Sequence, residues 1–154
     1  MNGEREQTLS ELLPPERIKL HVKVNSWQQA VQEVGSVLHQ TGAIEERFID
    51  AMIQTTQELG PYIVIAPGIA LPHAQPEAGA KKTALSMVKL DEPIEFGNPD
   101  NDPVEIVIGL SAVDNKKHVK ALSSLAELLL NKEKVAQLFQ CQTKDELVKI
   151  FNEF

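Results

Sequence analysis

The order of helix-like and strand-like segments constrains the fold of this chain more than any other feature. Apolar side chains recur at three- and four-residue steps over 27–41, after a capping-box pattern at Ser26 and Gln29, and again over 45–58. The same periodicity returns after Asp114 and continues toward the end of the chain. The sequence therefore predicts amphipathic helices near both ends.

Strand-like sequence fills the middle of the chain. Apolar runs at 62–66, 83–90 and 104–112 predict three strands, and the third has one face formed by Val104, Ile106, Ile108 and Leu110. Turn-forming residues over 97–103 separate the last two runs. Helices that bracket such a β region predict an α/β sandwich in which helices cover a mixed sheet.

The length of 154 residues fits a single domain that spans 1–154. We expect residues 1–8 to form a loosely ordered lead segment. The one cysteine, Cys141, excludes an internal disulfide and a zinc site built on several thiolates. We expect this thiol to be a small, partly buried side chain and not a nucleophile, because no basic residue lies closer in sequence than Lys144.

Charge and hydropathy exclude two classes of partner. The net charge is −7 and there is no long run of lysine or arginine, which disfavours nucleic acid. The longest apolar run, 62–71, is broken by Pro67 and Gly68 and has about half of the roughly 20 residues that a membrane-spanning helix needs. The first seven residues lack the pattern of a signal peptide. We therefore expect a cytoplasmic protein without direct membrane insertion.

The four histidines are the candidate reactive groups. None of the spacings among His21, His39, His73 and His118 puts two imidazoles on one helical turn or two residues apart on a strand, so no metal site is predicted. A phosphate-binding GxxxxGK[ST] loop and a GxSxG nucleophile motif are both absent from the sequence. We expect His21 on the polar side of a short strand and His39 at the polar end of the first helix.

His73 has the strongest claim to chemistry. It follows a predicted strand in the segment 67–74, where two prolines and a glycine stiffen the backbone. A neutral imidazole is a nucleophile near pH 7, since its ordinary pKa is about 6.5 and one ring nitrogen keeps its lone pair. Such a ring can accept a phosphoryl group and pass it on. The alternative is that His73 merely completes a turn.

His118 is a second candidate at the start of a helix. It stands four residues after Asp114, a plausible N-cap, and therefore in the first turn of the predicted helix. Backbone N–H groups and the positive end of the helix dipole favour an anion there. The alternative is a solvated first-turn residue without a role.

The segment Gly68-Ile69-Ala70-Leu71-Pro72-His73, followed by a strand at 83–88, resembles the IIA domain of the bacterial phosphoenolpyruvate-dependent sugar phosphotransferase system, mannitol/fructose type. The resemblance runs from about Leu9 to the C-terminus. Within this family the chain is most similar to the ascorbate-type IIA proteins, through the blocks 60–68, 101–104 and 112–114.

The resemblance implies a fold and a reaction. The fold is a mixed, mainly parallel sheet with helices on both faces. The reaction is phosphoryl transfer from the phosphocarrier HPr to His73, at Nε2 with Nδ1–H held by a backbone carbonyl, and then to a cysteine of a IIB protein. His118 would lie beside His73 and hydrogen-bond the phosphate. The IIB protein and the IIC membrane permease would be separate chains, and no cofactor is expected.

Two positions depart from the family pattern. Mannitol and fructose members are expected to carry an arginine on the helix before the active loop, whereas the stretch 54–57 reads Gln-Thr-Thr-Gln. Gln75 stands where ascorbate-type relatives would carry a basic residue. Either backbone amides and hydroxyls such as those of Thr55 or Thr56 hold the phosphate, or the protein transfers it less efficiently. Separately, we expect the apolar side chains of Ile69 and Leu71 to dock the partners.

Two functions remain open on this basis. One is a transport component for ascorbate or a related sugar acid, and the other is a regulatory phosphohistidine module that controls another protein without sugar transport. A binding domain without phosphorylation is a third. The apolar helix faces leave a homodimer open as well, since periodicity does not distinguish a core face from a subunit contact.

Overall fold

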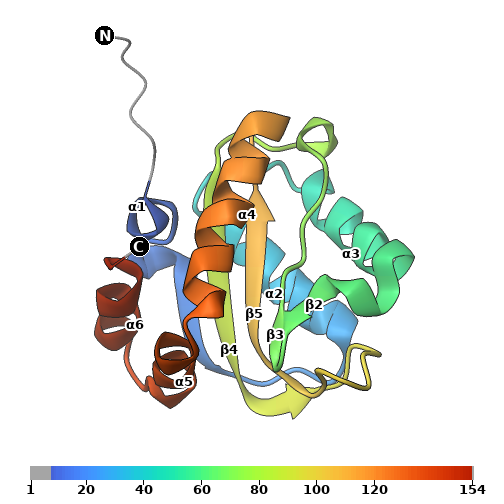
Figure 1. Cartoon of the computed structure of the whole chain (residues 1–154). Coiled ribbons are helices and arrows are strands. Elements are labelled where there is room, and N and C mark those ends of the chain that lie inside the picture. The colour runs from blue at the N-terminus through green and yellow to red at the C-terminus, as the bar shows by residue number, and fades with distance from the viewer. Residues whose placement is uncertain (1–7, 154) are drawn as a thin grey trace, which may run out of the picture.

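A five-stranded sheet between two layers of helices forms the frame of the protein (Figure 1). The computed structural model describes residues 8–153. The strands, in spatial order, are β1 (Ile18–Val22), β4 (Ala84–Ile94), β5 (Val104–Ser111), β3 (Ile69–Ala70) and β2 (Val64–Ala66). The β1–β4 and β3–β5 pairs are parallel, and the β4–β5 and β2–β3 pairs are antiparallel. The predicted α/β sandwich with a mixed sheet is confirmed, with two parallel and two antiparallel pairings where the resemblance implies mainly parallel ones.

One layer consists of the N-terminal turn and the C-terminal helices. Its elements are α1 (Leu9–Leu12), α4 (Asn115–Leu130), α5 (Lys132–Gln140) and α6 (Lys144–Phe151). They bury apolar side chains such as Leu125, Leu128 and Phe151 against Ile106 and Ile108 of the central strand. In Figure 1 α4 crosses in front of β5, which places the N-terminus of α4 beside the C-terminal end of that strand.

The other layer is formed by α2 (Trp27–Gln40) and α3 (Arg47–Leu59). Their apolar faces enclose a second core around Val107 and Val88. At Gly109 of β5 the sheet approaches α2 closely, because a Cβ atom built there would lie 3.0 Å from Val34 Cβ of that helix. The Ser86 hydroxyl donates a hydrogen bond to the Val34 carbonyl at 2.8 Å. Glycine at this position therefore permits the α2 layer to rest on the sheet.

Helices α2 and α4 begin where the sequence predicts. The Ser26 hydroxyl accepts the backbone N–H of Gln29, and the Asp114 carboxylate accepts that of Lys117 at 2.7 Å. Each of these bonds satisfies a backbone donor that has no partner inside its helix. The Gln29 side chain accepts from the backbone N–H of Asn25 instead of that of Ser26, so only half of the expected capping box forms.

The strands differ from the prediction in three respects. The run 62–66 is a strand only from Val64, because Gly60 and Pro61 begin the 3₁₀ turn η2 (Gly60–Ile63), which leaves Tyr62 exposed. The two-residue strand β3 was not predicted. Val104 does not share a face with Ile106, Ile108 and Leu110; it packs in the α2–α3 core, where the register of β4 and β5 shifts.

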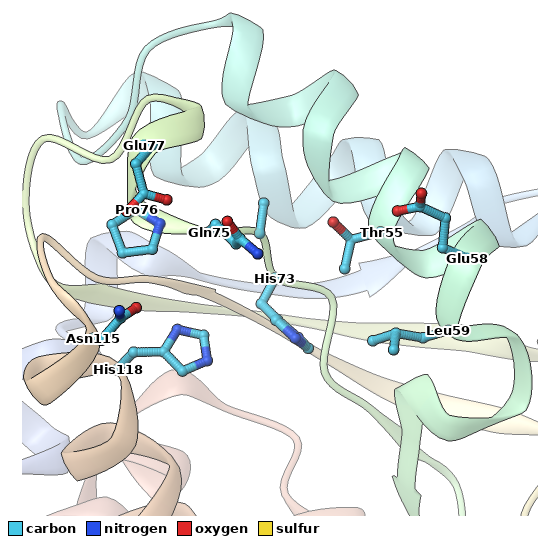
Figure 2. Close-up of a pocket in the computed structure, with 10 residues that line it drawn as sticks. Thr55, Glu58, Leu59, His73, Gln75, Pro76, Glu77, Asn115 and His118 are labelled. Carbon is cyan, nitrogen blue, oxygen red and sulfur yellow. The ribbon is translucent and has the colours of Figure 1, made fainter.

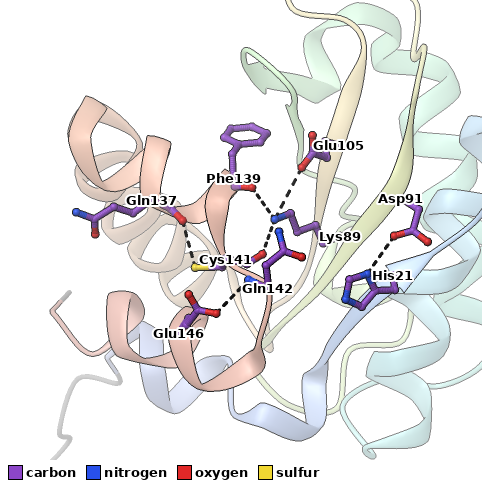
Figure 3. A network of polar contacts seen from close by, with 9 residues as sticks. All are labelled: His21, Lys89, Asp91, Glu105, Gln137, Phe139, Cys141, Gln142 and Glu146. Carbon is purple, nitrogen blue, oxygen red and sulfur yellow. Dashed lines mark hydrogen bonds and ion pairs between the residues drawn. The ribbon is translucent and has the colours of Figure 1, made fainter.

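A buried lysine connects the sheet to the C-terminal helices (Figure 3). Lys89 Nζ of β4 donates hydrogen bonds to the carbonyls of Phe139 and Cys141, each at 2.6 Å, and lies 3.9 Å from a Glu105 carboxylate oxygen. Both carbonyls belong to the end of α5, where the dipole favours a cation. Cys141 itself is buried and donates to the Gln137 carbonyl, and burial raises the pKa of its thiol, which fits the predicted unreactive side chain.

Two expectations concern the chain as a whole. The lead segment predicted at 1–8 lies outside the described residues except for Thr8, which caps α1. Over residues 8–153, no helix combines the length and the apolar character that crossing a membrane requires.

Candidate functional site

The loop that carries His73 is fixed to the central strand. After β3 the chain continues alongside β5, where the Leu110 N–H donates to the Pro72 carbonyl at 3.1 Å and His73 forms a parallel bridge with Leu110. On the other side, the Leu71 N–H donates to the Ile63 carbonyl at 2.9 Å. The histidine is therefore held at the end of the sheet by backbone hydrogen bonds on both sides.

The His73 ring is half-buried and its tautomer is set by the backbone. Nδ1 lies 2.8 Å from the carbonyl oxygen of Leu71. Because a carbonyl oxygen can only accept, Nδ1 donates, and in the neutral ring the lone pair is then on Nε2. The predicted contact between Nδ1–H and a backbone carbonyl is confirmed.

His118 faces His73 from the first turn of α4 (Figure 2). The two ring centroids are 5.4 Å apart and the ring planes meet at 68°. Burial, and secondly the neighbouring His73, lower the pKa of His118 from its ordinary 6.5. A neutral imidazole at pH 7 can share a small anion with His73 through one ring N–H. Chain segments 45 residues apart in sequence thus bring both candidate histidines to one place.

Both rings line a pocket of about 460 Å³. Its walls come from the end of α3, the loop around η3 (Pro76–Ala78) and the start of α4, and its lining residues are Thr55, Glu58, Leu59, His73, Ala74, Gln75, Pro76, Glu77, Asn115 and His118. The hydroxyl and amide groups of Thr55, Gln75 and Asn115 are neutral hydrogen-bond donors. The charged side chains of the lining are Glu58 and Glu77.

The two threonines of α3 differ in position. Thr55 lines the pocket, whereas Thr56 is 4% exposed, and its hydroxyl donates to the Met52 carbonyl at 2.8 Å. A residue turns by about 100° around an α-helix, so neighbours face different ways, and Thr56 shares the buried face with Met52. Of the two expected phosphate ligands, only Thr55 lies at the pocket.

Ile69 and Leu71 are not docking residues. They are 0% and 3% exposed and form part of the α4-side core, because the loop expected to be exposed pairs with β5. Of the exposed apolar side chains, Leu59 lines the pocket, and Val119, which is 64% exposed, follows His118 in sequence.

Neither described arginine reaches the pocket. Arg17 donates to Thr41, and Arg47 pairs with Glu45 at 3.0 Å and donates to the Glu77 carbonyl. Among residues 8–153, no lysine or arginine side chain belongs to the pocket lining. The stretch 54–57 lacks the arginine expected in mannitol and fructose members, and no other element within 8–153 supplies a lysine or arginine to the pocket lining.

Several lining residues escaped the sequence analysis. Glu58 and Leu59 follow Thr55 at helical steps of three and four, so the face that carries Thr55 could have indicated them. Asn115 directly follows the N-cap Asp114, and Glu77 lies in a turn that only the folded loop brings to the site. The remaining histidines lie apart: His21 Nδ1 contacts Asp91 at 3.2 Å, and His39 is exposed in the last turn of α2.

Known proteins are similar to this chain in sequence and in fold. The family described as "Phosphoenolpyruvate-dependent sugar phosphotransferase system, EIIA 2" matches residues 11–154. The ascorbate-specific PTS system EIIA component of Escherichia coli K12 is 37% identical over 136 residues, which are 88% of each chain.

Two solved structures from Escherichia coli share the fold. The mannitol-specific cryptic phosphotransferase enzyme IIA is 36% identical with a TM-score of 0.84, covering 96% of this chain and all of that one. Enzyme IIAMTL, in its complex with phosphorylated enzyme IIBMTL, is 26% identical with a TM-score of 0.80, covering 90% of this chain and 96% of that one. Members of the matched family are phosphotransferase components that carry phosphohistidine. This chain belongs to that family, the type 2 EIIA components of the phosphoenolpyruvate-dependent sugar phosphotransferase system.

Proposed function

We propose that this protein accepts a phosphoryl group from HPr on Nε2 of His73 and passes it to a cysteine of a cognate IIB protein. The observation that carries the proposal is the pairing of His73, with its tautomer set by Leu71, and His118 in one open pocket. The Escherichia coli complex of enzyme IIAMTL with phosphorylated enzyme IIBMTL, a relative of the same fold, supports the second step.

The transfer needs little covalent assistance from the protein. The Nε2 lone pair forms a bond to phosphorus while the bond from phosphorus to the donor nitrogen breaks, and the donor keeps that electron pair. Nδ1 retains its proton on the Leu71 carbonyl. In the second step a cysteine thiolate attacks phosphorus and the electron pair returns to Nε2. Catalysis then consists of positioning and of stabilising the phosphoryl oxygens.

Neutral groups would bind these oxygens. His118 can donate a ring N–H, and the Thr55 hydroxyl can donate from the opposite wall. The first turn of α4 adds backbone N–H groups whose dipole favours an anion. Three kinds of donor thus replace the arginine that the stretch 54–57 lacks.

The partners would dock on the apolar rim of the pocket. Leu59 is an exposed pocket residue of α3, and Val119 is exposed on α4 next to His118 in sequence, so a partner that covers the pocket would contact both helices. HPr and the IIB protein would bind this same rim. The sugar carried by the IIC permease would receive its phosphoryl group from the IIB protein, so the permease needs no contact here. Sugar specificity resides in those chains, and the ascorbate-specific relative supports ascorbate or a related sugar acid.

Intact mass measurement tests the proposal. The protein is incubated with phosphoenolpyruvate, enzyme I and HPr, and one added phosphoryl group is expected on the wild type and none on His73→Ala. Addition of a IIB protein should then remove the group. A His73→Ala variant that is phosphorylated at the normal rate contradicts the assignment. Phosphorylation that no IIB protein discharges would favour the regulatory module.

A further inference from the structure

We propose that Glu58 and Glu77 repel the phosphoryl group on His73 and thereby raise its tendency to leave for a partner. This inference rests on the proposed function and assigns these carboxylates a role in the equilibrium of transfer. They would be positioning residues that act through charge.

Both carboxylates belong to the pocket that holds the reacting nitrogen. Glu58 comes from the last turn of α3 and Glu77 from η3, so they approach from different walls (Figure 2). Both residues are exposed, and neither carboxylate forms an ion pair with another residue of the described range 8–153. The guanidinium of Arg47 is neutralised by Glu45 and bonds to the backbone of Glu77, not to its carboxylate. Both carboxylates therefore line the pocket without an ion-pair partner among these residues, and each can act on a phosphoryl group there through its charge.

The rest of the lining offers no compensating fixed cation. Its other side chains are neutral or imidazole, and burial beside His73 favours the uncharged form of His118 before phosphate arrives. Lys116 and Lys117 follow Asn115 on α4, but neither lines the pocket. An anionic phosphoryl group thus enters a site with two like charges nearby, and Coulomb repulsion disfavours the phosphorylated state of His73 relative to a free histidine.

This repulsion has a direction in the pathway. It acts on the phosphorylated protein and not on the neutral imidazole, so it shifts the exchange equilibrium toward the phosphorylated partner. Repulsion between exposed charges also weakens as salt shortens the Debye length, which is about 10 Å at 0.1 M. A hydrogen-bonding or packing role of the same side chains would not share that salt dependence.

The test is an exchange equilibrium between phosphorylated HPr and this protein, read by intact mass for both chains. Glu58→Gln and Glu77→Gln should each raise the equilibrium fraction of phosphorylated His73, with an equilibrium constant roughly two- to fivefold higher at low salt. The double variant should show the product of both factors. The gain should shrink toward unity in about 1 M salt. Glu92→Gln is the matched control. Glu92 is exposed near the C-terminal end of β4, whereas Leu85, near the other end of that strand, pairs with Leu110 beside His73.

Each outcome decides a separate point. Equilibrium constants unchanged in both pocket variants, lowered in either, or raised to the same extent by Glu92→Gln, overturn the inference while leaving the proposed function intact. A gain that persists in high salt overturns it too. Wild-type protein that takes no phosphoryl group from HPr overturns the proposed function, and this inference with it.

Discussion

The carbonyl oxygen of Leu71 accepts the Nδ1 proton of His73 at 2.8 Å, within the same loop. Leu71 is itself fixed through its N–H to Ile63, so the acceptor does not move with the ring. The contact selects one tautomer before any partner arrives, which removes that ordering cost from the transfer step.

The first prediction follows from this tautomer. In ¹⁵N NMR spectra of the neutral protein, Nδ1 of His73 should have the shift of a protonated nitrogen and Nε2 that of an unprotonated one. After phosphorylation, coupling to ³¹P should appear at Nε2. Coupling at Nδ1 would show that the Leu71 contact breaks during transfer and would contradict the proposed geometry.

The pKa of His118 should be below its ordinary value in the free protein and should rise on phosphorylation of His73. Burial and His73 lower its pKa from 6.5 in the free protein. A phosphoryl anion beside the ring favours the imidazolium, so phosphorylation should raise the pKa of His118. Proton NMR titration of both forms measures the two values. A pKa that does not rise on phosphorylation would remove His118 from the phosphate site.

The lowered pKa also has a consequence for stability. Below about pH 6.5 the unfolded chain binds a proton at this position more readily than the native one, so the free energy of unfolding falls as pH drops from there toward the native pKa. His118→Asn should flatten that part of the stability profile, as read by urea denaturation. Its transfer rate should fall without vanishing, since the reacting nitrogen is on His73.

Thr55 and Thr56 offer a matched pair of substitutions. Thr55→Val removes a donor to the phosphoryl oxygens, and losing one hydrogen bond to a charged group costs roughly 1.5–3 kcal/mol, or about 10- to 100-fold in rate. Thr56→Val removes only the bond to the Met52 carbonyl. The rate of phosphoryl transfer from HPr, measured by quenching the reaction at set times, should therefore fall in Thr55→Val. In Thr56→Val it should stay within about twofold of wild type. The reverse order would contradict the assignment.

The docking rim can be tested with two exposed residues of one helix. Val119 and Leu130 are 64% and 82% exposed and lie near opposite ends of α4. Val119→Ser should lower kcat/KM for transfer from HPr, by roughly threefold or more for the loss of a buried apolar contact. Leu130→Ser should leave it unchanged. Equal effects would show that the partner does not favour the rim.

Lys89 should matter for stability and not for transfer. Lys89→Met leaves the carbonyls of Phe139 and Cys141 without their donor, at a cost of about 2–4 kcal/mol in the free energy of unfolding. Lys19→Met removes an exposed ion pair to Glu33 and should cost less than about 1 kcal/mol. Urea denaturation of both variants gives the comparison. Equal losses would mean that the buried network contributes no more than the exposed ion pair.

The helices were predictable because their signals are local. Ser26 and Asp114 cap α2 and α4 through side-chain contacts three residues away, which a sequence records directly. The strand β3 has two residues and no periodicity, and it is defined by its pairing with Ile106 and Val107 of β5 on one side and with β2 on the other. Such pairing depends on distant sequence.

The site shows the same division. His73 and His118 were found from the chemistry of their neighbours in sequence. The burial of Ile69 and Leu71 was not, since a Pro-Gly loop ordinarily lies at the surface and here continues the sheet. Glu77 joins the pocket only through the fold of its loop. Local pattern thus identified the two histidines of the pocket and missed most of the residues around them.

The shared pocket has a kinetic consequence. His73 and His118 line one pocket between α3 and α4. On the proposed function, the phosphoryl donor and the phosphoryl acceptor would therefore bind the same small surface one after the other. Turnover should then follow a ping-pong scheme with parallel double-reciprocal lines, and an excess of either unloaded partner should inhibit competitively. On this proposal, the rate at which each partner dissociates from the pocket should limit the flux of phosphoryl groups through the protein.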